Sequence, residues 1–297
     1  MMADGADAGA AWENPLIPNA RLRKIYLAML RARALSRALP SGRGGRGTLG
    51  IEACLASTAV DLGPADLVSD ALGGGVIDFL RGAALGEAMR PGSAKKRGPV
   101  ADCGAAVRLA APAGIADRLW AAMGAAAALK TAAANTKAEA KANGAAACDS
   151  GVVMVYALPE QVPAALWRQV LAFAHAQELP VLFALLPPKR TKGGKTLGRV
   201  SDIALRCGMP GIPVDADDAV AIYRVAQESI GHARIGGGAA LIECVPFVAA
   251  GASSKRADAI DVLEGYLVER RVATRSWMDS EAKSFAKRLT EEQAASK

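Results

Sequence analysis

The chain has 297 residues, of which 52% are hydrophobic and 22% charged, a composition typical of a globular protein. A chain of this length can bury a real core, in one large α/β domain or in two smaller domains. No stretch approaches the roughly 20 apolar residues of a membrane span, and the first 15 residues lack the basic start and apolar segment of a secretory signal, so we expect a soluble cytoplasmic protein. The net charge of +7 is concentrated between Arg21 and Arg46, where eight Lys and Arg residues meet no Asp or Glu. Only Tyr26 supplies an aromatic ring there, which disfavours nucleic-acid binding and favours a solvated helix face or a patch that meets an acidic subunit.

Cysteine and histidine usage argues against a disulfide framework, a zinc site and a histidine-based triad. The cysteines are odd in number, widely spread and without a Cys-x-x-Cys pair: Cys54, Cys103, Cys148, Cys207 and Cys244. Such a pattern indicates reduced thiols. The two histidines, His175 and His232, have no acidic cluster beside them, so no metal-binding residue is predicted.

The first half of the chain predicts a tail followed by helices. Residues 1–18 are expected to be a flexible tail, and residues 19–297 a single α/β domain. A helix begins at Asn19, a plausible N-cap, and ends near Pro40, before the glycine-rich segment 42–47. That segment follows no strand, so an anion cradle there is disfavoured. We then expect a helix over 50–62, a turn over 63–66, a strand at 67–68, a helix over 77–82 and a helix over 118–130. Small residues in the last helix predict that it is buried, and residues 131–150 read as an Ala/Lys-rich surface excursion, helical in part.

The stretch 152–218 predicts a strand, a helix and a second strand. The apolar runs 152–158 and 181–186 do not alternate, which favours strands buried on both faces of a parallel sheet. Pro159 and Pro163 fit the start of the intervening helix. Its expected buried face comprises Val162, Leu166, Val170 and Phe173. Ligands of such units usually lie beyond the carboxyl ends of the strands.

The remaining segments complete an α/β pattern. A strand is expected over 212–214, a helix capped by Asp217 and ending near Arg234, a strand over 239–245, and C-terminal helices within 255–297. His232 falls in the last turn of the helix that Asp217 caps. The Gly-Lys-Thr at 194–196 is similar to the end of a phosphate-binding loop, but Lys189 stands where its first glycine belongs, so nucleotide binding is disfavoured.

Several short motifs occur in a characteristic order along the chain. Residues 50–53 read Gly-Ile-Glu-Ala, 62–66 Leu-Gly-Pro-Ala-Asp, 179–183 Leu-Pro-Val-Leu-Phe, 208–218 Gly-Met-Pro-Gly-Ile-Pro-Val-Asp-Ala-Asp-Asp, and 241–243 Leu-Ile-Glu. Over roughly residues 19–290 this order resembles the alpha subunit of thiamine-diphosphate-dependent 2-oxo acid dehydrogenases of the pyruvate, branched-chain and acetoin type. The resemblance implies a thiamine-diphosphate-binding-type fold, with a mostly parallel sheet and helices on both faces, and pairing with a beta-type subunit in an alpha2-beta2 hetero-oligomer.

The cofactor positions that the resemblance implies have changed. The family holds Mg²⁺ and diphosphate with Gly-Asp-Gly after the first core strand and with Asn-Asn after the second. Here Leu158, Pro159 and Glu160 occupy the first place, and Pro187 and Pro188 the second. Proline offers no side-chain oxygen and no N–H, and Glu160 lies one position late.

The substrate-side positions have changed as well. The family's Tyr-Arg-x-His aligns with residues 72–75, Leu-Gly-Gly-Gly, and its Gly-His-Ser with residues 251–253, Gly-Ala-Ser. No catalytic, cofactor-binding or metal-binding residue is therefore predicted.

Three hypotheses follow. The first is a non-catalytic or regulatory alpha-like subunit that pairs with a beta-type subunit. The second is an active oxidative decarboxylase that binds thiamine diphosphate and Mg²⁺ through a rebuilt site, using Glu160 or another residue. The third is a basic scaffold or nucleic-acid binder using the segment between Arg21 and Arg46.

Overall fold

A computed structural model describes residues 16–39, 48–70, 75–89, 107–109, 114–143, 150–187, 199–246 and 258–295. The helices are α1 (Asn19–Ala38), α2 (Glu52–Ala59), α3 (Gly75–Leu80), α4 (Leu85–Met89), α6 (Ile115–Asn143), the 3-10 helix η1 (Pro159–Gln161), α7 (Ala164–Ala176), α8 (Val200–Arg206), α9 (Ala219–Arg234), α10 (Ala259–Glu269) and α11 (Arg275–Ala295). The strands are β1 (Leu67–Asp70), β2 (Val107–Arg108), β3 (Val153–Ala157), β4 (Val181–Leu185), β5 (Gly211–Asp215) and β6 (Ala240–Val245).

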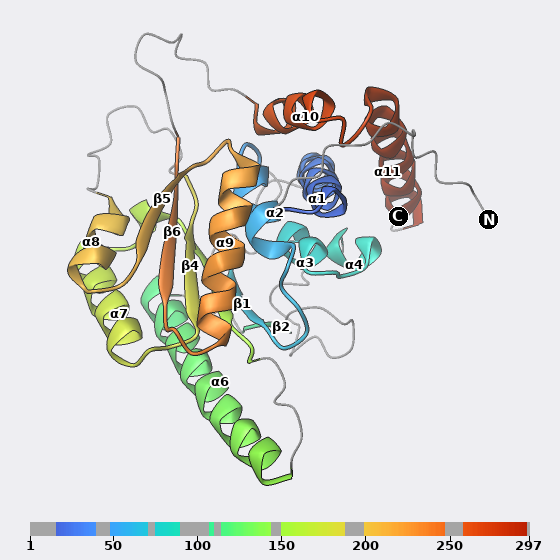
Figure 1. The fold of residues 1–297 in the computed structure, drawn as a ribbon. Coiled ribbons are helices and arrows are strands. Elements are labelled where there is room, and N and C mark those ends of the chain that lie inside the picture. Colours follow the sequence, from blue (N-terminus) through green and yellow to red (C-terminus); the bar gives the residue numbers. More distant parts are fainter. Residues whose placement is uncertain are drawn as a thin grey trace.

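The six described strands form one parallel sheet in the order β2-β1-β3-β4-β6-β5 (Figure 1). Every residue of β3 and β4 is buried, as their unbroken apolar runs predict. β5 lies at one edge, where Pro213 is exposed and cannot donate a ladder hydrogen bond to a further strand. The predicted α/β fold with a parallel central sheet is confirmed.

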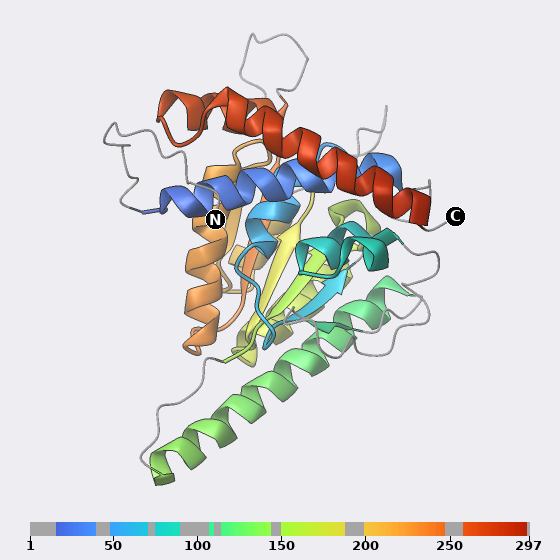
Figure 2. The ribbon, with the colours of Figure 1, turned by 90° about the vertical axis from the view of Figure 1, so that its right-hand side faces the viewer.

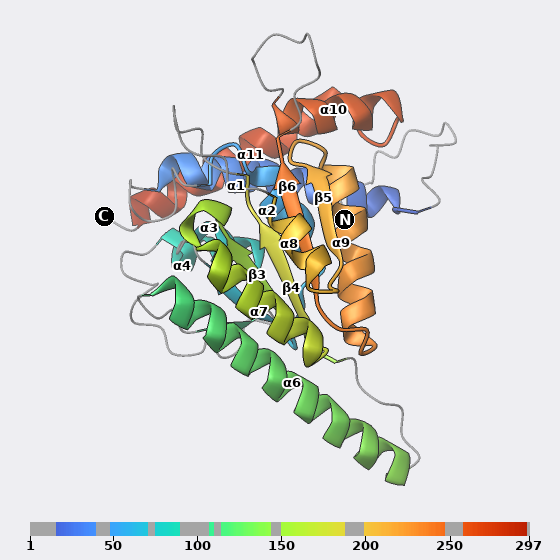
Figure 3. The ribbon, with the colours of Figure 1, turned by 90° about the vertical axis from the view of Figure 1, so that its left-hand side faces the viewer.

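Each face of the sheet has its own apolar core. Val153, Val155, Phe183 and Leu185 face one core, which α6, α7 and α8 cover (Figure 3). Their neighbours along the strands face the other core, which belongs to α1, α2, α3, α9, α10 and α11. Gly151, just before β3, is required by packing, because a Cβ there would collide with the Ala65 carbonyl oxygen.

Two helices differ from their predicted form. α6 is one continuous helix that includes most of the expected surface excursion and projects past the sheet (Figure 2). It is not buried all round: Gly124 and Ala128 are exposed, whereas Ala122 and Ala126 are buried.

The predicted inner face of α7 was wrong at Phe173. Phe173 is 39% exposed, and its ring lies 5.5 Å from that of Trp120. The buried positions of α7 are Trp167, Val170, Leu171 and Ala174. Leu166 is half-buried, so the buried stripe is centred on Val170 and Leu171, about one position further along the helix than predicted.

Smaller corrections concern the helix ends. Asp218, not Asp217, caps α9, since its carboxylate accepts a hydrogen bond from the Ala221 N–H at 2.9 Å. Ile17 lies inside the segment expected to be a tail but is fully buried. The glycine-rich segment 42–47, the Gly-Lys-Thr at 194–196, Cys103 and Cys148 lie outside the described residues.

A partly buried ion-pair network joins α1 to α2 and to the start of α10. The Arg33 guanidinium donates to both Glu52 carboxylate oxygens, at 2.9 and 3.2 Å, and to Asp258 Oδ2 at 2.6 Å. Glu52 is completely buried and also accepts the Gly50 N–H at 3.0 Å. Burial opposes the ionisation of Asp258, but the bonds from Arg33 and from the Ile260 N–H outweigh it and lower the pKa of Asp258.

We predict that Arg33→Ala lowers the free energy of unfolding by about 3–5 kcal/mol, because it leaves the Glu52 carboxylate buried without its cation. Urea unfolding followed by circular dichroism measures the change. Arg37→Ala, at an exposed position of the same helix, is the matched control and should stay within about 0.5 kcal/mol of the unmodified protein. Equal losses in the two variants would show that the network does not stabilise the fold.

Candidate functional site

The carboxyl ends of all described strands lie at one edge of the sheet, where α/β proteins usually bind ligands. The strands end there at Asp70, Ala157, Leu185, Asp215 and Val245. This carboxyl edge is the candidate site.

The residues that follow β3 and β4 at the carboxyl edge are apolar and mostly buried. Leu158 is 5% exposed, and Pro159, Leu186 and Pro187 are buried. Glu160 is exposed within η1, so its carboxylate lies outside this buried layer. Pro188, Leu72 and residues 251–253 lie outside the described residues, and Gly75 is the first residue of α3.

No group of three or more His, Cys, Asp and Glu side chains that could hold a metal ion occurs within the described ranges. Mg²⁺ takes oxygen ligands, and the side chains of Leu158, Pro159 and Pro187 provide none. The described residues at the places implied for the cofactor therefore do not fit a magnesium–diphosphate group.

A buried polar cluster beneath the edge was missed by the sequence interpretation. The hydroxyls of Tyr156 and Thr58 lie 2.9 Å apart, which links β3 to α2. Arg81 and Asp78 form a buried ion pair at 3.0 Å, and Asp70 is 4% exposed at the end of β1. Alternation along β3 could have placed Tyr156 on the α2 side, but no local signal pairs it with Thr58.

The electrostatics of this cluster keep the Tyr156 phenol neutral. Burial is the largest influence and raises the pKa of Tyr156 well above its ordinary value; the Asp70 charge adds to the rise, while Thr58 and Arg81 oppose it. A buried phenol held this way is a poor proton donor near neutral pH. The Tyr156–Thr58 pair therefore serves to join β3 to α2.

Other residues singled out in the sequence have structural roles. Glu243 of β6 accepts the N–H groups of Val200 at 3.1 Å and Ser201 at 2.8 Å, which fixes the start of α8. Asp215 accepts the Asp217 N–H at 3.0 Å in a turn. Among the described cysteines, Cys54, Cys207 and Cys244 form no disulfide bond.

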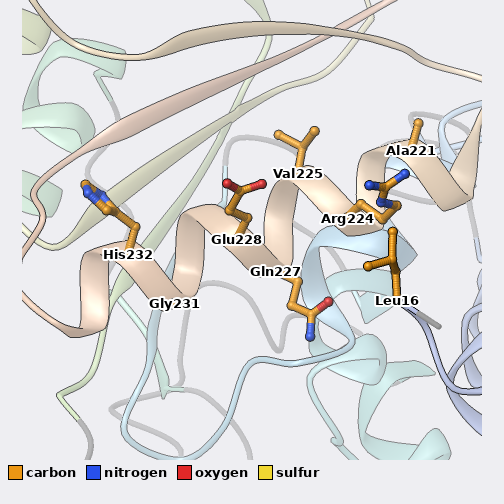
Figure 4. Close-up of a pocket in the computed structure, with 8 residues that line it drawn as sticks. All are labelled: Leu16, Ala221, Arg224, Val225, Gln227, Glu228, Gly231 and His232. Carbon is orange, nitrogen blue, oxygen red and sulfur yellow. The ribbon is translucent and has the colours of Figure 1, made fainter.

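The two histidines lie away from the carboxyl edge. His175 is exposed on α7 beside Gly208, and His232 is exposed in the last turn of α9, as predicted. His232 borders an open hollow of about 580 Å³ along α9, shown in Figure 4. The lining residues Arg224, Glu228 and His232 follow one another along the helix, an arrangement that forms no catalytic group.

The cations of the basic segment contact the chain itself. The Arg21 guanidinium lies 2.6 Å from the Asp61 carboxylate, and that of Arg31 lies 3.3 Å from Glu281. Arg23 donates to the Val272 carbonyl at 2.7 Å and Lys24 to the Val60 carbonyl at 3.1 Å. Together with Arg33, these residues join α1 to its neighbours. Arg23, Lys24 and Arg37 lie at exposed positions of α1, whereas Arg21, Arg31 and Arg33 are half-buried, so the helix has a solvated face but several of its cations contact this chain.

The fold is an α/β arrangement of the thiamine-diphosphate-binding type. The family model described as "Dehydrogenase E1 component" matches residues 189–255. The alpha subunit of acetoin:2,6-dichlorophenolindophenol oxidoreductase from Bacillus subtilis (strain 168) is 46% identical over 48 residues, which cover 16% of this chain and 14% of that protein. The chloroplastic alpha-3 subunit of the pyruvate dehydrogenase E1 component from Oryza sativa subsp. japonica is 29% identical over 141 residues, covering 41% and 32%.

Over the matched residues the chain is similar to alpha subunits of dehydrogenase E1 type, which agrees with the resemblance that the order of motifs predicted. The aligned part is less than a third of either relative's length. Within the described residues, no helix is long and apolar enough to cross a membrane.

We predict that the free energy of unfolding falls as the pH rises above about 10. An unfolded tyrosine loses its proton near pH 10. Folded Tyr156, with its raised pKa, keeps its proton, so stability is complete below pH 10 and declines above it. Urea unfolding between pH 8 and 11 measures the slope.

Tyr156→Phe should reduce this slope without abolishing it, because burial also raises the pKa of Tyr26 and of Tyr223. Thr58→Val removes the same hydrogen bond but keeps the phenol, so it should cost about 1 kcal/mol at neutral pH and retain the alkaline decline. An unchanged slope in Tyr156→Phe would contradict the assignment.

Proposed function

We propose that this protein is a non-catalytic or regulatory alpha-like subunit that pairs with a beta-type subunit of a 2-oxo acid dehydrogenase. The observation that carries the proposal is a contrast between two sets of residues. Motif residues that hold the fold together keep polar contacts, whereas Leu158, Pro159 and Pro187 at the carboxyl edge are buried and carry no side-chain oxygen.

The carboxylates within the motifs support a retained scaffold. Asp66 is fully buried and accepts the N–H groups of Gly63 at 2.8 Å and Val152 at 2.9 Å, together with the Arg234 guanidinium at 2.7 Å. Glu52 joins α2 to α1, as described above. A chain that maintains these internal contacts has a fixed outer surface for a partner.

The names of the relatives support an assembly role. Each is named an alpha subunit, and such subunits normally pair with beta subunits in hetero-oligomers. An alpha2-beta2 assembly in the cytoplasm is the form we propose for this chain.

Active decarboxylation receives less support. It would require Glu160 to act in cofactor binding, but Glu160 is exposed in η1 and belongs to no described group of metal-ligating side chains. The scaffold or nucleic-acid hypothesis is also weakened, since the α1 cations Arg21, Arg31 and Arg33 are paired with carboxylates of this chain.

We predict that the full chain, co-expressed with a beta-type subunit, elutes as a hetero-oligomer in size-exclusion chromatography with light-scattering detection. Separate runs of each subunit give the reference masses. Recovery of this chain as a monomer, with no beta-type subunit in its peak, would overturn the proposal. A mobility-shift assay at low salt should show no retained nucleic acid.

A further inference from the structure

Five buried residues form what we name the apolar closure: Leu158, Pro159, Val162, Leu186 and Pro187. We propose that this closure fills the space at the carboxyl ends of β3 and β4 and excludes a magnesium–diphosphate group from it. The chain then reaches its full stability without such a group. The inference deepens the proposed function and rests on it for the identity of the excluded group.

The closure belongs to both cores of the protein. Leu158 and Leu186 are part of the core that includes α2, and Val162 is part of the core beneath α7. Leu158, Val162 and Leu186 are at most 5% exposed, and Pro159 and Pro187 are buried as well. A ligand at this place would have to displace packed side chains and not merely fill a space.

The backbone of the closure is also committed to internal hydrogen bonds. The Leu186 N–H donates to the Ala157 carbonyl at 2.9 Å, which ties the ends of the two strands together. The carbonyls of Leu158 and Pro159 accept the N–H groups of Gln161 at 3.0 Å and Val162 at 3.3 Å. Pro159 and Pro187 have no N–H to offer a phosphate oxygen.

The chemistry of the closure opposes a hard cation. Mg²⁺ requires oxygen ligands in near-octahedral geometry, and a charge buried among apolar groups without partners is strongly unfavourable. Glu160, the nearest carboxylate in the sequence, is exposed outside the closure. The buried groups Tyr156 and Thr58 are joined to each other beneath it.

Calorimetry and thermal unfolding of the full chain test the proposal, with Mg²⁺ and thiamine diphosphate added together at millimolar concentration. We expect no binding heat and an unchanged melting temperature, whether or not a beta-type subunit is present. Because a ligand that binds only the folded state must raise its stability, a saturable heat or a raised melting temperature for this chain alone would overturn the closure. Failure to find a beta-type partner would refute the pairing and leave this result intact, so the two proposals fail separately.

A substitution provides a second test, one that does not rely on the absence of binding. Pro159→Asp restores a carboxylate where the family has one, at a buried position, and should lower the melting temperature, with no recovery on adding Mg²⁺ and thiamine diphosphate. Pro163→Asp is the matched control, because Pro163 is exposed at the N-cap of α7, where aspartate is favourable. Recovery of the Pro159→Asp variant by the cofactor mixture would overturn the proposal. If that variant does not fold, the calorimetry of the unmodified chain decides.

Discussion

The need to cover both faces of a parallel sheet determines most of this structure. Strands β3 and β4 expose no face to solvent, so the helices must divide into one set for each face of the sheet. The strands are parallel, so the chain must return from the carboxyl end of one strand to the amino end of the next. The faces are then filled by side chains, and a ligand can reach the sheet only at the strand ends. The character of a few residues after β3 and β4 therefore decides what the protein can bind. Pro213 on the edge strand limits a second route of contact, which is pairing with the strand of another molecule.

The polar residues of the family-like motifs act within the fold. Glu52 connects three helices through Arg33, Asp66 connects a turn to β3 and α9, and Glu243 holds the first N–H groups of α8. Each carboxylate is buried and satisfied by several donors, so removing it would leave those donors without partners. A side chain whose only partner is a metal ion, in contrast, makes no contact that stabilises the fold when the ion is absent. A scaffold held by such contacts can therefore persist while the residues at a ligand site change.

The sequence predicted the strands well because buried parallel strands have a local signature, the short apolar run that does not alternate. It failed where the outcome depends on other parts of the chain. The apolar positions of α7 fit two overlapping stripes, and packing against the sheet selects the one that buries Trp167 and leaves Phe173 partly exposed. Arg33 and Asp258 are 225 positions apart, so no spacing rule could pair them, and the cations of α1 appeared to be free. For the site, motif comparison located Leu158 and Pro187, but the polar cluster around Tyr156 depends on contacts between distant elements.

The residues that stand at the implied cofactor positions have a physical consequence under our proposal. A buried carboxylate intended for Mg²⁺ destabilises the fold whenever the ion is absent, because the charge then lacks a partner in a medium of low polarity. Replacing it with Pro159, beside Leu158 and Leu186, removes that cost and adds apolar surface to the core. The same exchange makes the ion's return unfavourable, since oxygen ligands are gone and packed side chains occupy the place. Stability without the cofactor and exclusion of the cofactor are thus two effects of the same residues, which is what a subunit retained for its surface, and not for its chemistry, would require.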